Sequence, residues 1–449
     1  MRRELSGWGR TSPSAAEVVT PLTPAELAAS VAAAGPRGTI ARGLGRSYGD
    51  AAQNAGGRVV DTAMVDDVAS FDAETGRLQV GAGASLDQLM RALVPRGWFV
   101  PVTPGTRFVT VGGAIASDIH GKNHHRSGSW CQHVSELTLA TPELGTVTVG
   151  PAADADLFWA TAGGMGLTGG VVDATVALSP IATSRALVDT DRTDDLDDCM
   201  ALLAAGDDDY TYTVAWVDLL PLEGARGRSV ITRGRFARPD ELSPDARRDP
   251  LAFDPQPLAS VPPLVPSGLL NRWSIQAGNE VWYRRAPKVK RDEIQSISRF
   301  FHPLDGVSDW NLLYGPRGFL QWQIVVPFGA EEALRWVAEQ FQVSRVPTLI
   351  GVLKRFGPAN PGPLSFPMAG WTLALDVPAT VDGLGRFLER LDERVAEAGG
   401  RIYLAKDSRM RPELLATMYP RLDEWRAVRD RVDPRGVIQS DLGRRLGLC

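Results

Sequence analysis

The sequence of 449 residues contains only three cysteines, Cys131, Cys199 and Cys449. Three isolated thiols form neither a disulfide framework nor a zinc-binding pattern, so we expect them to be reduced. Long apolar runs are also missing, because no segment approaches the roughly 18 uninterrupted apolar residues of a membrane span. No apolar stretch follows Arg2 and Arg3, so we expect no signal peptide. These features predict a cytoplasmic protein.

Positive charge is not concentrated in any block of the chain. Lys and Arg number 48 against 53 Asp and Glu, which gives a net charge of −5. Because a nucleic-acid-binding protein needs a basic patch, this balance argues against that class of protein. Apolar residues make up 44% of the chain, which is typical of a globular protein. At 449 residues the chain is too long for one ordinary core, so we expect two domains.

What the sequence does contain is two glycine-rich segments in its N-terminal third, residues 41–50 and 104–125. Glycine lets backbone N–H groups gather around an oxyanion without a Cβ in the way, so such segments can cradle phosphates. Each segment follows a short apolar strand. Together they predict one extended ligand that is held from both sides, and a dinucleotide fits that description.

The spacing of the first segment excludes the Rossmann fold. Its glycines read Gly43-x-Gly45-x-x-x-Gly49, although Asp61 follows at the end of the next predicted strand. A Rossmann loop must also open a helix, whereas residues 47–57 are polar, rich in glycine and without a 3.6-residue period. We therefore expect loop amides to meet the phosphates, and not a helix dipole.

Periodicity predicts short strands with inserted helices in the first 180 residues, and alternating strands again near the C-terminus. Capping boxes at Thr23–Glu26 and Ser85–Gln88 each begin a predicted helix. Strands are expected at residues 39–40, 77–80, 134–139, 146–149, 319–326 and 371–376. Strands 134–139 and 146–149 are expected to form a hairpin. Helices at 330–341 and 381–398 are expected to flank strands 319–326 and 371–376.

Residues 250–266 hold six prolines among apolar residues without any period. A compact domain rarely carries so long a structureless stretch unless it is a lid or is disordered. Exposed apolar patches usually mark a partner or a membrane surface, so we expect a mobile lid that orders over substrate or at a bilayer. A loop docked permanently on the substrate domain is the alternative. The acidic stretches 191–198 and 207–209 are interpreted as solvated faces.

Several longer strings resemble known flavoproteins. Residues 42–50, Thr110-Val-Gly-Gly113 and residues 156–169 resemble the FAD domain of vanillyl-alcohol-oxidase-type flavoproteins. Narrower strings resemble the decaprenylphosphoryl-β-D-ribose 2′-oxidase family, and they are residues 118–125, Phe356-Gly-Pro358, residues 405–409 and the tail 432–446. The resemblance runs from about Gly7 to the C-terminus.

The resemblance implies an α+β fold with two domains. It places an FAD-binding domain at 7–180 and a substrate-binding domain at 181–395, built on an antiparallel sheet with helices and carrying the lid at 250–268. Residues 396–449 return to the FAD domain. The implied enzyme is an FAD-dependent oxidoreductase that acts on a CH–OH group.

The implied reaction oxidises the 2′-hydroxyl of polyprenyl-phosphoryl-β-D-ribose to the keto sugar. A partner keto-reductase of the short-chain type would complete the epimerisation to the arabinose donor for cell-wall arabinan in actinobacteria. Peripheral contact with the inner membrane and an extracytoplasmic location both stay open. So do two other functions, an alditol or aldonolactone oxidase of the same fold and a flavin-binding partner protein without turnover.

FAD is expected to bind without a covalent bond. Many relatives in the wider superfamily attach FAD through a histidine just before a serine of the first loop, and Arg46 stands in that place before Ser47. The residues that the resemblance implies for FAD binding are Ala41, Arg42, Gly43, Leu44, Gly45, Arg46, Ser47, Tyr48, Gly49, Asp50, Ala51, Gly105, Thr110, Val111, Gly112, Gly113, Ser117, Asp118, Ile119, His120, Val172 and Tyr403.

Two residues are expected to carry the chemistry, Lys406 and His120. Removing a hydroxyl proton as hydride leaves calls for a cation that stabilises the alkoxide, or for a desolvated amine that takes the proton. The apolar, strand-like residues 402–405 would place the Lys406 ammonium at a strand end. The resemblance puts His120 beside the flavin. No metal is expected, and three further histidines are interpreted as loop and packing residues, namely His124, His125 and His133.

The substrate pocket is expected to be polar. Lys122 and Lys354 match pocket lysines of the family, and Tyr48, Gln321 and Gln323 match its polar lining. Because Gln321 and Gln323 share one face of a strand, both can point into one cavity, or both can lie on an exposed face. Two positions depart from the family pattern, where Ala374 replaces a cysteine and Thr372 an asparagine. No reactive thiol is therefore expected at residue 374.

Overall fold

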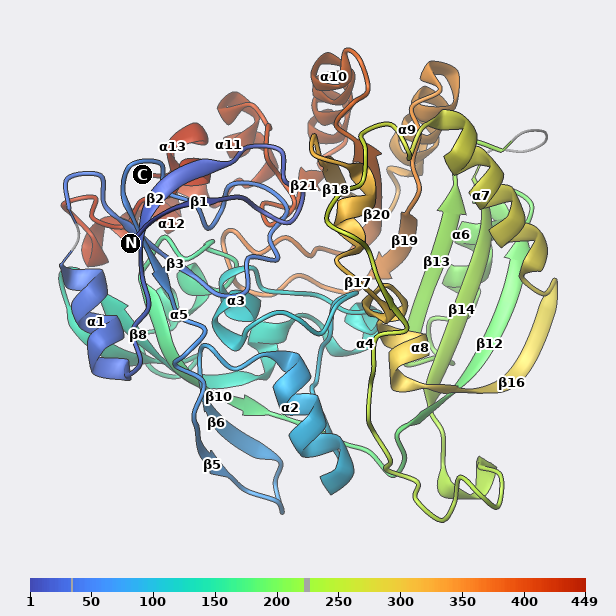
Figure 1. Cartoon of the computed structure of the whole chain (residues 1–449), viewed down its shortest axis with the longest axis horizontal. Coiled ribbons are helices and arrows are strands. Elements are labelled where there is room, and N and C mark those ends of the chain that lie inside the picture. The colour runs from blue at the N-terminus through green and yellow to red at the C-terminus, as the bar shows by residue number, and fades with distance from the viewer. Residues whose placement is uncertain (34, 222–226) are drawn as a thin grey trace.

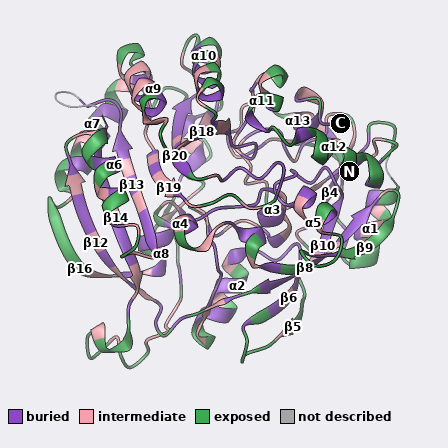
Figure 2. Ribbon diagram, turned by 180° about the vertical axis from the view of Figure 1, so that it is seen from behind, coloured by how far each residue is buried: buried purple, intermediate pink, exposed green. Residues whose placement is uncertain are grey.

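The chain folds into two halves that lie side by side in Figure 1. This computed structural model describes residues 1–33, 35–221 and 227–449. The blue N-terminal strands and the red C-terminal helices share one half, and an eight-stranded sheet forms the other. Figure 2 shows that the central strands of that sheet are buried, whereas the helices expose their outer faces.

A four-stranded sheet with the order β1-β2-β4-β3 begins the first half. Its strands β1 to β4 span Arg2–Leu5, Ser14–Val19, Thr39–Arg42 and Arg58–Asp61. Helix α1, Pro24–Ala32, starts as predicted, since the Thr23 hydroxyl accepts a hydrogen bond from the Glu26 amide at 3.2 Å. The Glu26 carboxylate accepts from the Leu22 amide, so the reciprocal bond of a capping box is missing.

A five-stranded antiparallel sheet follows, with the order β5-β6-β10-β8-β9. These strands are β5 Val68–Phe71, β6 Arg77–Gly81, β8 Val134–Thr141, β9 Gly145–Val149 and β10 Gly170–Ala177. The predicted hairpin of β8 and β9 is confirmed. The inserted helices are α2 Leu86–Leu93, α3 Val111–Ala116, α4 His124–Ser127 and α5 Ala155–Thr161. The predicted capping box of Ser85 and Gln88 begins α2.

The second half is an antiparallel sheet with the order β16-β12-β14-β13-β19-β20-β18-β21. Its strands are β12 Arg185–Thr193, β13 Tyr212–Asp218, β14 Arg228–Phe236, β16 Val289–Ser296, β18 Phe319–Pro327, β19 Gly351–Phe356, β20 Gly370–Pro378 and β21 Arg401–Ile402. β18 and β20 are the two strands predicted from alternation.

Helices pack around this sheet. They are α6 Leu196–Ala205, α7 Arg272–Arg285, α8 Ile297–Phe301, α9 Glu331–Ser344 and α10 Leu384–Glu397. α9 and α10 confirm the two predicted helices and bury Val337 and Leu388 in the same core as Ile324 of β18. Two short pairs complete the strands, β7 Trp98–Phe99 with β11 Ser179–Pro180, and β15 Ala259–Ser260 with β17 Val307–Ser308.

The last residues return to the first half of the molecule. After β21 come α11 Leu415–Met418, α12 Leu422–Val432 and α13 Asp441–Arg445. Thr39 of β3 forms a parallel bridge with Ile438, and the buried Trp425 indole donates to the Ala160 carbonyl. The chain therefore crosses between the halves twice, and the second crossing passes Lys406.

The interpretation of residues 191–198 as a solvated face is wrong for Asp191. Its side chain is buried on β12 and pairs with Arg233 of β14 at 2.7 Å and with Arg291 of β16 at 2.6 Å. Composition shows a run of acids, but the two cations that neutralise this carboxylate come from neighbouring strands. Cross-strand pairing of this kind cannot be predicted from a local pattern.

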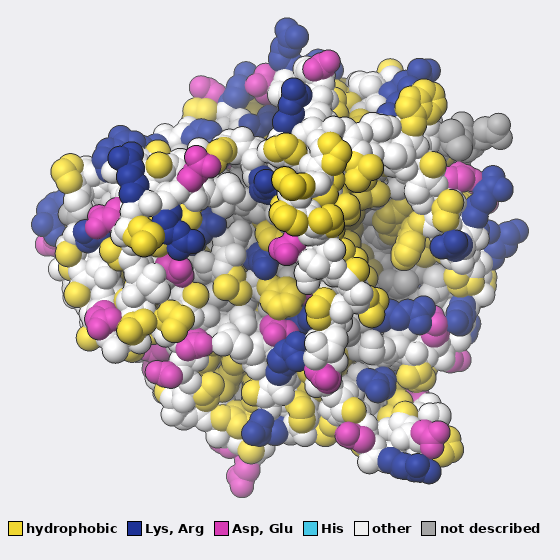
Figure 3. All heavy atoms as spheres, in the orientation of Figure 1, with side chains coloured by type: hydrophobic (Ala, Val, Ile, Leu, Met, Phe, Trp, Pro, Cys, Tyr) yellow, Lys and Arg dark blue, Asp and Glu magenta, His cyan; other side chains and the backbone are white. Residues whose placement is uncertain are grey.

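Residues 250–266 are irregular apart from the two residues of β15. Leu251 and Phe253 pack against the core, whereas Leu258 and Leu264 are each 92% exposed. Figure 3 shows hydrophobic side chains gathered on the face of the molecule that carries β17. The mobility of this segment stays a prediction.

Candidate active site

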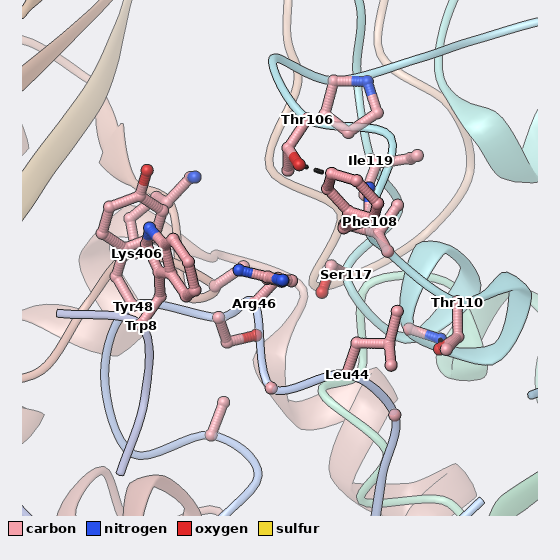
Figure 4. Close-up of a pocket in the computed structure, with 18 of the residues that line it drawn as sticks. Trp8, Leu44, Arg46, Tyr48, Thr106, Phe108, Thr110, Ser117, Ile119 and Lys406 are labelled. Carbon is pink, nitrogen blue, oxygen red and sulfur yellow. Dashed lines mark hydrogen bonds between the residues drawn. The ribbon is translucent and has the colours of Figure 1, made fainter. Parts of the chain in front are cut away.

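A cavity of about 450 Å³ lies between the glycine segments and the eight-stranded sheet. Residues from distant parts of the chain line it, among them the two glycine segments, the strands β18 to β20, the turn at Lys406 and residues 304–310. Figure 4 shows Arg46 near the middle, with Tyr48, Trp8 and Lys406 on one side of it and Phe108 and Thr106 on the other. Such a volume is typical of a small-molecule or cofactor site.

The first glycine segment follows β3 and stays irregular, as predicted. The Tyr48 amide donates to the Ala405 carbonyl at 3.0 Å, which ties this loop to the turn that carries Lys406. An ideal Cβ on Gly49 would lie 2.0 Å from the Asp407 carbonyl oxygen. Glycine at residue 49 therefore allows the two backbones to approach this closely.

The second glycine segment does open a helix. Thr110 is the N-cap of α3, and its hydroxyl accepts from the Gly113 amide at 3.2 Å. A Cβ on Gly43 of the first loop would lie 2.2 Å from the same hydroxyl oxygen. The two loops thus meet at Thr110, so a ligand can contact both.

Most of the predicted site residues share this cavity. Those that line it are Ala41, Arg42, Gly43, Leu44, Gly45, Arg46, Ser47, Tyr48, Ala51, Gly105, Thr110, Gly112, Gly113, Ser117, Ile119, His120, Gln321, Gln323, Lys354, Tyr403 and Lys406. Gly49 lies behind the first loop against Asp407, and Val111 and Val172 are in the core. The remaining three, Asp50, Asp118 and Lys122, have partners elsewhere.

Asp50 and Asp118 hold chain segments together. Asp50 forms an ion pair with Arg445 of α13 at 2.8 Å. Asp118 is fully buried, and its carboxylate accepts from the Cys131 amide and from the Asn360 side chain. Both carboxylates therefore shape the walls without lining the cavity.

Lys122 lies outside the cavity, in contrast to its expected place in the substrate pocket. Its ammonium donates to the Phe300 carbonyl and lies 4.4 Å from the centroid of the Phe300 ring. Burial, with the nearby Lys354 charge as a smaller cause, lowers the pKa of Lys122 to about 7. The carbonyl and the ring of Phe300, a residue distant in sequence, thus hold this lysine outside the cavity.

His120 is a buried polar residue of the cavity. Its Nε2 lies 2.9 Å from Gln323 Nε2, and the Lys354 ammonium lies 3.4 Å from its Nδ1. Burial lowers the pKa of His120 well below the ordinary value, and the charge of Lys354 lowers it further. The imidazole is therefore neutral near pH 7 and can exchange hydrogen bonds with a hydroxyl.

Lys406 sits in a turn, and not at a strand end as expected. β21 stops at Ile402, and the Lys406 amide donates to the Tyr403 carbonyl at 2.9 Å. The ammonium lies 3.9 Å from the centroid of the Tyr48 ring. Burial lowers the pKa of Lys406 to about 7, while the Asp376 carboxylate acts in the opposite direction. Near neutral pH this amine can hold or release a proton.

Gln321 and Gln323 do point into one cavity from the same face of β18, so the exposed-face alternative is wrong. The Gln321 amide donates to the Tyr48 hydroxyl at 3.2 Å and to Asp376 Oδ1 at 2.5 Å. Gln323 donates to the Thr372 hydroxyl at 3.1 Å. These bonds fix both amides against the neighbouring strand β20.

Sequence reasoning missed the aromatic end of the cavity. Trp8 and Trp310 line it, with ring centroids 5.9 Å apart, and the Arg46 guanidinium lies 3.9 Å from the Trp8 ring centroid. Asp305 also lines the cavity. The only local sign of Trp8 was its place between two glycines. Trp310 had none, because it lies far along the chain in a 3-10 helix of only five residues, Trp310–Tyr314.

The other histidines near His120 have ordinary partners, as interpreted. His124 Nδ1 accepts from the Gly357 amide at 3.1 Å. His125 Nε2 lies 3.0 Å from the Tyr210 carbonyl and His133 Nε2 2.8 Å from the Ser127 carbonyl. In the described ranges of the chain, no group of three or more His, Cys, Asp or Glu side chains could hold a metal ion.

Comparisons with known proteins agree with this geometry. An FAD-binding domain model matches residues 15–150, and a D-arabinono-1,4-lactone oxidase model matches residues 377–446. The chain is 46% identical to decaprenylphosphoryl-β-D-ribose oxidase of Mycolicibacterium smegmatis over 99% of this chain and 98% of that protein. It is 43% identical to an uncharacterised Streptomyces coelicolor protein over 81% of this chain and all of that one.

More distant relatives match a shorter part. Cytokinin dehydrogenase 7 of rice is 31% identical over 40% of this chain and 36% of its own length.

Among residues 1–33, 35–221 and 227–449, no helix is long and apolar enough to cross a membrane.

The glycine end of the cavity fits FAD. Gly43 and Gly49 leave no room for a Cβ, whereas a Cβ on Gly105 would meet nothing within 4 Å, which leaves the cavity wall open there. The Arg46 Nε atom is buried and has no hydrogen-bond partner among the described residues. Arginine cannot form the histidyl bond to flavin, so the cofactor at this loop is not covalently attached.

Proposed function

The chain belongs to the decaprenylphosphoryl-β-D-ribose oxidase family, and we propose that it oxidises the 2′-hydroxyl of a polyprenyl-phosphoryl-β-D-ribose to the keto sugar. It is an FAD-dependent oxidoreductase of the vanillyl-alcohol-oxidase type. The observation that carries the proposal is the group formed by the buried His120 and Gln323 with the half-buried Lys354 and Lys406. These polar residues share one cavity with the glycine loops.

The backbone amides of the two glycine segments would hold FAD, and Tyr403 and Ser117 form another wall of the cavity. Tyr403 donates to the Ser117 carbonyl at 2.8 Å and is buried, so this wall is rigid. When bound, FAD accepts the hydride that leaves the sugar carbon. Gly49, Asp50, Val111, Asp118 and Val172 support the binding loops from behind.

The polar residues supply the remaining chemistry. Neutral His120 and the Gln323 amide orient the sugar by hydrogen bonds to its hydroxyl groups. Lys406 either takes the hydroxyl proton as a free amine or stabilises the developing alkoxide as an ammonium. Lys354, whose pKa burial lowers to about 8, supplies positive charge near the phosphodiester.

The prenyl chain of the substrate would leave through the aromatic end of the cavity. Trp8, Trp310, Leu304 and Val307 are the apolar residues that line that end. An amphiphilic substrate with a sugar phosphate head matches a cavity that combines polar side chains with an aromatic cluster.

Substrate specificity gives the first test. We expect anaerobic mixing with polyprenyl-phosphoryl ribose to bleach the flavin, and mixing with free pentitols or aldonolactones to leave it oxidised. The reason is that the apolar end binds only a substrate with a lipid chain, and this binding energy positions the sugar. Stopped-flow absorbance of the flavin measures both reactions.

Each alternative function has its own outcome. Faster bleaching by a soluble alditol or lactone would favour the sugar oxidase, for which the match of residues 377–446 is the supporting observation. Stable colour with every sugar would favour a flavin-binding partner protein. The proposal also calls for a second enzyme, a short-chain-type keto-reductase, because the keto sugar must be reduced again to complete an epimerisation.

We also propose that the exposed leucines beside β15 contact the membrane. Leu258 donates its amide to the Gly306 carbonyl at 2.8 Å, and β15 pairs with β17, whose Val307 and Ser308 line the cavity. A prenyl chain that leaves the cavity here meets Leu258 and Leu264 at the surface. The segment would then order against a bilayer.

Replacing both leucines tests this contact. We expect Leu258→Asp combined with Leu264→Asp to weaken binding to anionic vesicles by about tenfold or more, because full burial of a leucine contributes about 1.5–3 kcal/mol. Vesicle sedimentation measures the binding, and vesicles should protect residues 250–266 of the parent protein from proteolysis. Val343→Asp, on the exposed face of α9, is the control. Equal binding by both variants would contradict the contact.

A further inference from the structure

Asp376 is a buried carboxylate beside the cavity that the reaction above does not use. It lies on β20, fully buried, and pairs directly with Gln321 of β18 in the strand register. Its Oδ1 accepts the Gln321 amide at 2.5 Å. A buried carboxylate is costly unless nearby charges or hydrogen bonds compensate it, so its presence here calls for an explanation.

A short chain of contacts connects Asp376 with Lys406. The Gln321 amide that donates to Asp376 also lies 3.2 Å from the Tyr48 hydroxyl, and the Lys406 ammonium lies over the Tyr48 ring. The second carboxylate oxygen, Oδ2, is buried without a hydrogen-bond partner in the described structure, and so is the Tyr314 hydroxyl. The Oδ2 atom of Asp376 therefore acts on its surroundings only through its charge.

We propose that Asp376 is a positioning residue for Lys406: its carboxylate stabilises the ammonium that forms when Lys406 takes the proton of the substrate hydroxyl, and Gln321 and Tyr48 fix the distance between the two. This inference rests on the proposed function. The hydroxyl O–H bond breaks, its proton and the new positive charge go to Lys406 Nζ, and the hydride goes to the bound cofactor. Asp376 acts in its ionised form, which the Lys406 ammonium favours.

The charges around Lys406 support this role. Lys354 on β19 opposes the ammonium form, and Lys406 in turn acts against protonation of His120. Asp376 is the carboxylate that favours the ammonium, and Lys406 favours the ionised form of Asp376. The other ionisable groups near Asp376 are the phenols of Tyr48 and Tyr314, whose pKa values burial and this carboxylate raise. Both phenols are therefore neutral.

Replacing Asp376 by asparagine removes the charge and keeps an oxygen that can accept the Gln321 amide. Without the carboxylate the ammonium is less stable, so the pKa of Lys406 falls. We expect Asp376→Asn to lower the pH midpoint of the reaction of Lys406 with trace acetic anhydride, so that labelling near pH 7, where part of Asp376 is ionised, rises about threefold, which corresponds to half a pKa unit. Peptide mass spectrometry of the substrate-free holoenzyme measures this labelling. Stopped-flow flavin reduction should show the same downward shift of its pH midpoint.

The control is Asp392→Asn. Asp392 is another buried carboxylate, and burial raises the pKa of both Asp376 and Asp392 to about 7. It lies on α10, where it accepts from the Trp322 indole and pairs with Arg409, and it does not line the cavity. This control should leave Lys406 labelling unchanged.

An unchanged labelling midpoint in folded Asp376→Asn would overturn the proposal. Labelling needs no substrate, so a shifted midpoint together with no sugar oxidation would reject the proposed function and keep the link between Asp376 and Lys406. If Asp376→Asn does not fold, Gln321→Leu breaks the same chain of contacts and should also shift the midpoint. Loss of stability in both variants without a shift in either would assign Asp376 a purely structural role.

Discussion

Lys406→Ala should lower the rate of flavin reduction by substrate about 10²–10³-fold and leave FAD bound, because it removes the proton acceptor or charge next to the reacting hydroxyl. The glycines that would hold FAD lie on other segments. Anaerobic single-turnover reduction measures the rate, and the flavin absorbance of the purified variant measures retention of the cofactor. In the parent protein, the Lys406 amine has a pKa of about 7 and is therefore deprotonated above that pH. If Lys406 is the base, the rate of flavin reduction should rise as the pH increases through about 7.

Lys122→Ala is the matched control for Lys406→Ala. Both lysines are half-buried, and desolvation lowers the pKa of each to about 7, but Lys122 faces Phe300 outside the cavity. The control should keep most of the rate. An unaltered rate in Lys406→Ala would remove Lys406 from the mechanism, and a rate that falls as pH rises would make it the electrostatic stabiliser.

The parts of the site that one continuous stretch encodes could be predicted from the sequence. The glycine spacing before residues 47–57 correctly excluded a helix there, since no amphipathic period follows. Alternation along β18 correctly placed Gln321 and Gln323 on one face. Both results rest on local backbone geometry, which needs no knowledge of the tertiary fold.

The parts that depend on distant segments could not be predicted. Lys122 is two residues from His120, yet its position depends on a carbonyl and a ring of α8. Asp376 had no signal of its own, because its link to Lys406 passes through a cross-strand partner on β18. The aromatic end of the cavity joins Trp8 to Trp310 across most of the chain. Long-range pairing of this kind leaves no periodic pattern in the sequence.

Gly49→Ala should lower both stability and activity more than any other glycine-to-alanine substitution near the cavity. Its Cβ would lie 2.0 Å from the Asp407 carbonyl oxygen, and this contact is with backbone that cannot rotate away. The loop and the turn would have to separate, which breaks the bond from the Tyr48 amide to Ala405 and moves Lys406. We expect a loss of about 1–3 kcal/mol in unfolding free energy. A displacement of about 1 Å can also cost about 10²-fold in rate. Denaturant unfolding and single-turnover flavin reduction measure the two effects.

Gly385→Ala is the control for Gly49→Ala. Gly385 is exposed on α10, and a Cβ there would meet nothing within 4 Å, so alanine should stabilise the helix by about 0.5–1 kcal/mol. Both variants add one methyl group, and only one of them separates the first glycine loop from the turn of Lys406. If Gly49→Ala unfolds like the parent protein and reduces its flavin at the parent rate, this close approach of two backbones does not position Lys406. A stable Gly49→Ala protein with slow reduction would show that the contact acts on the chemistry more than on the fold.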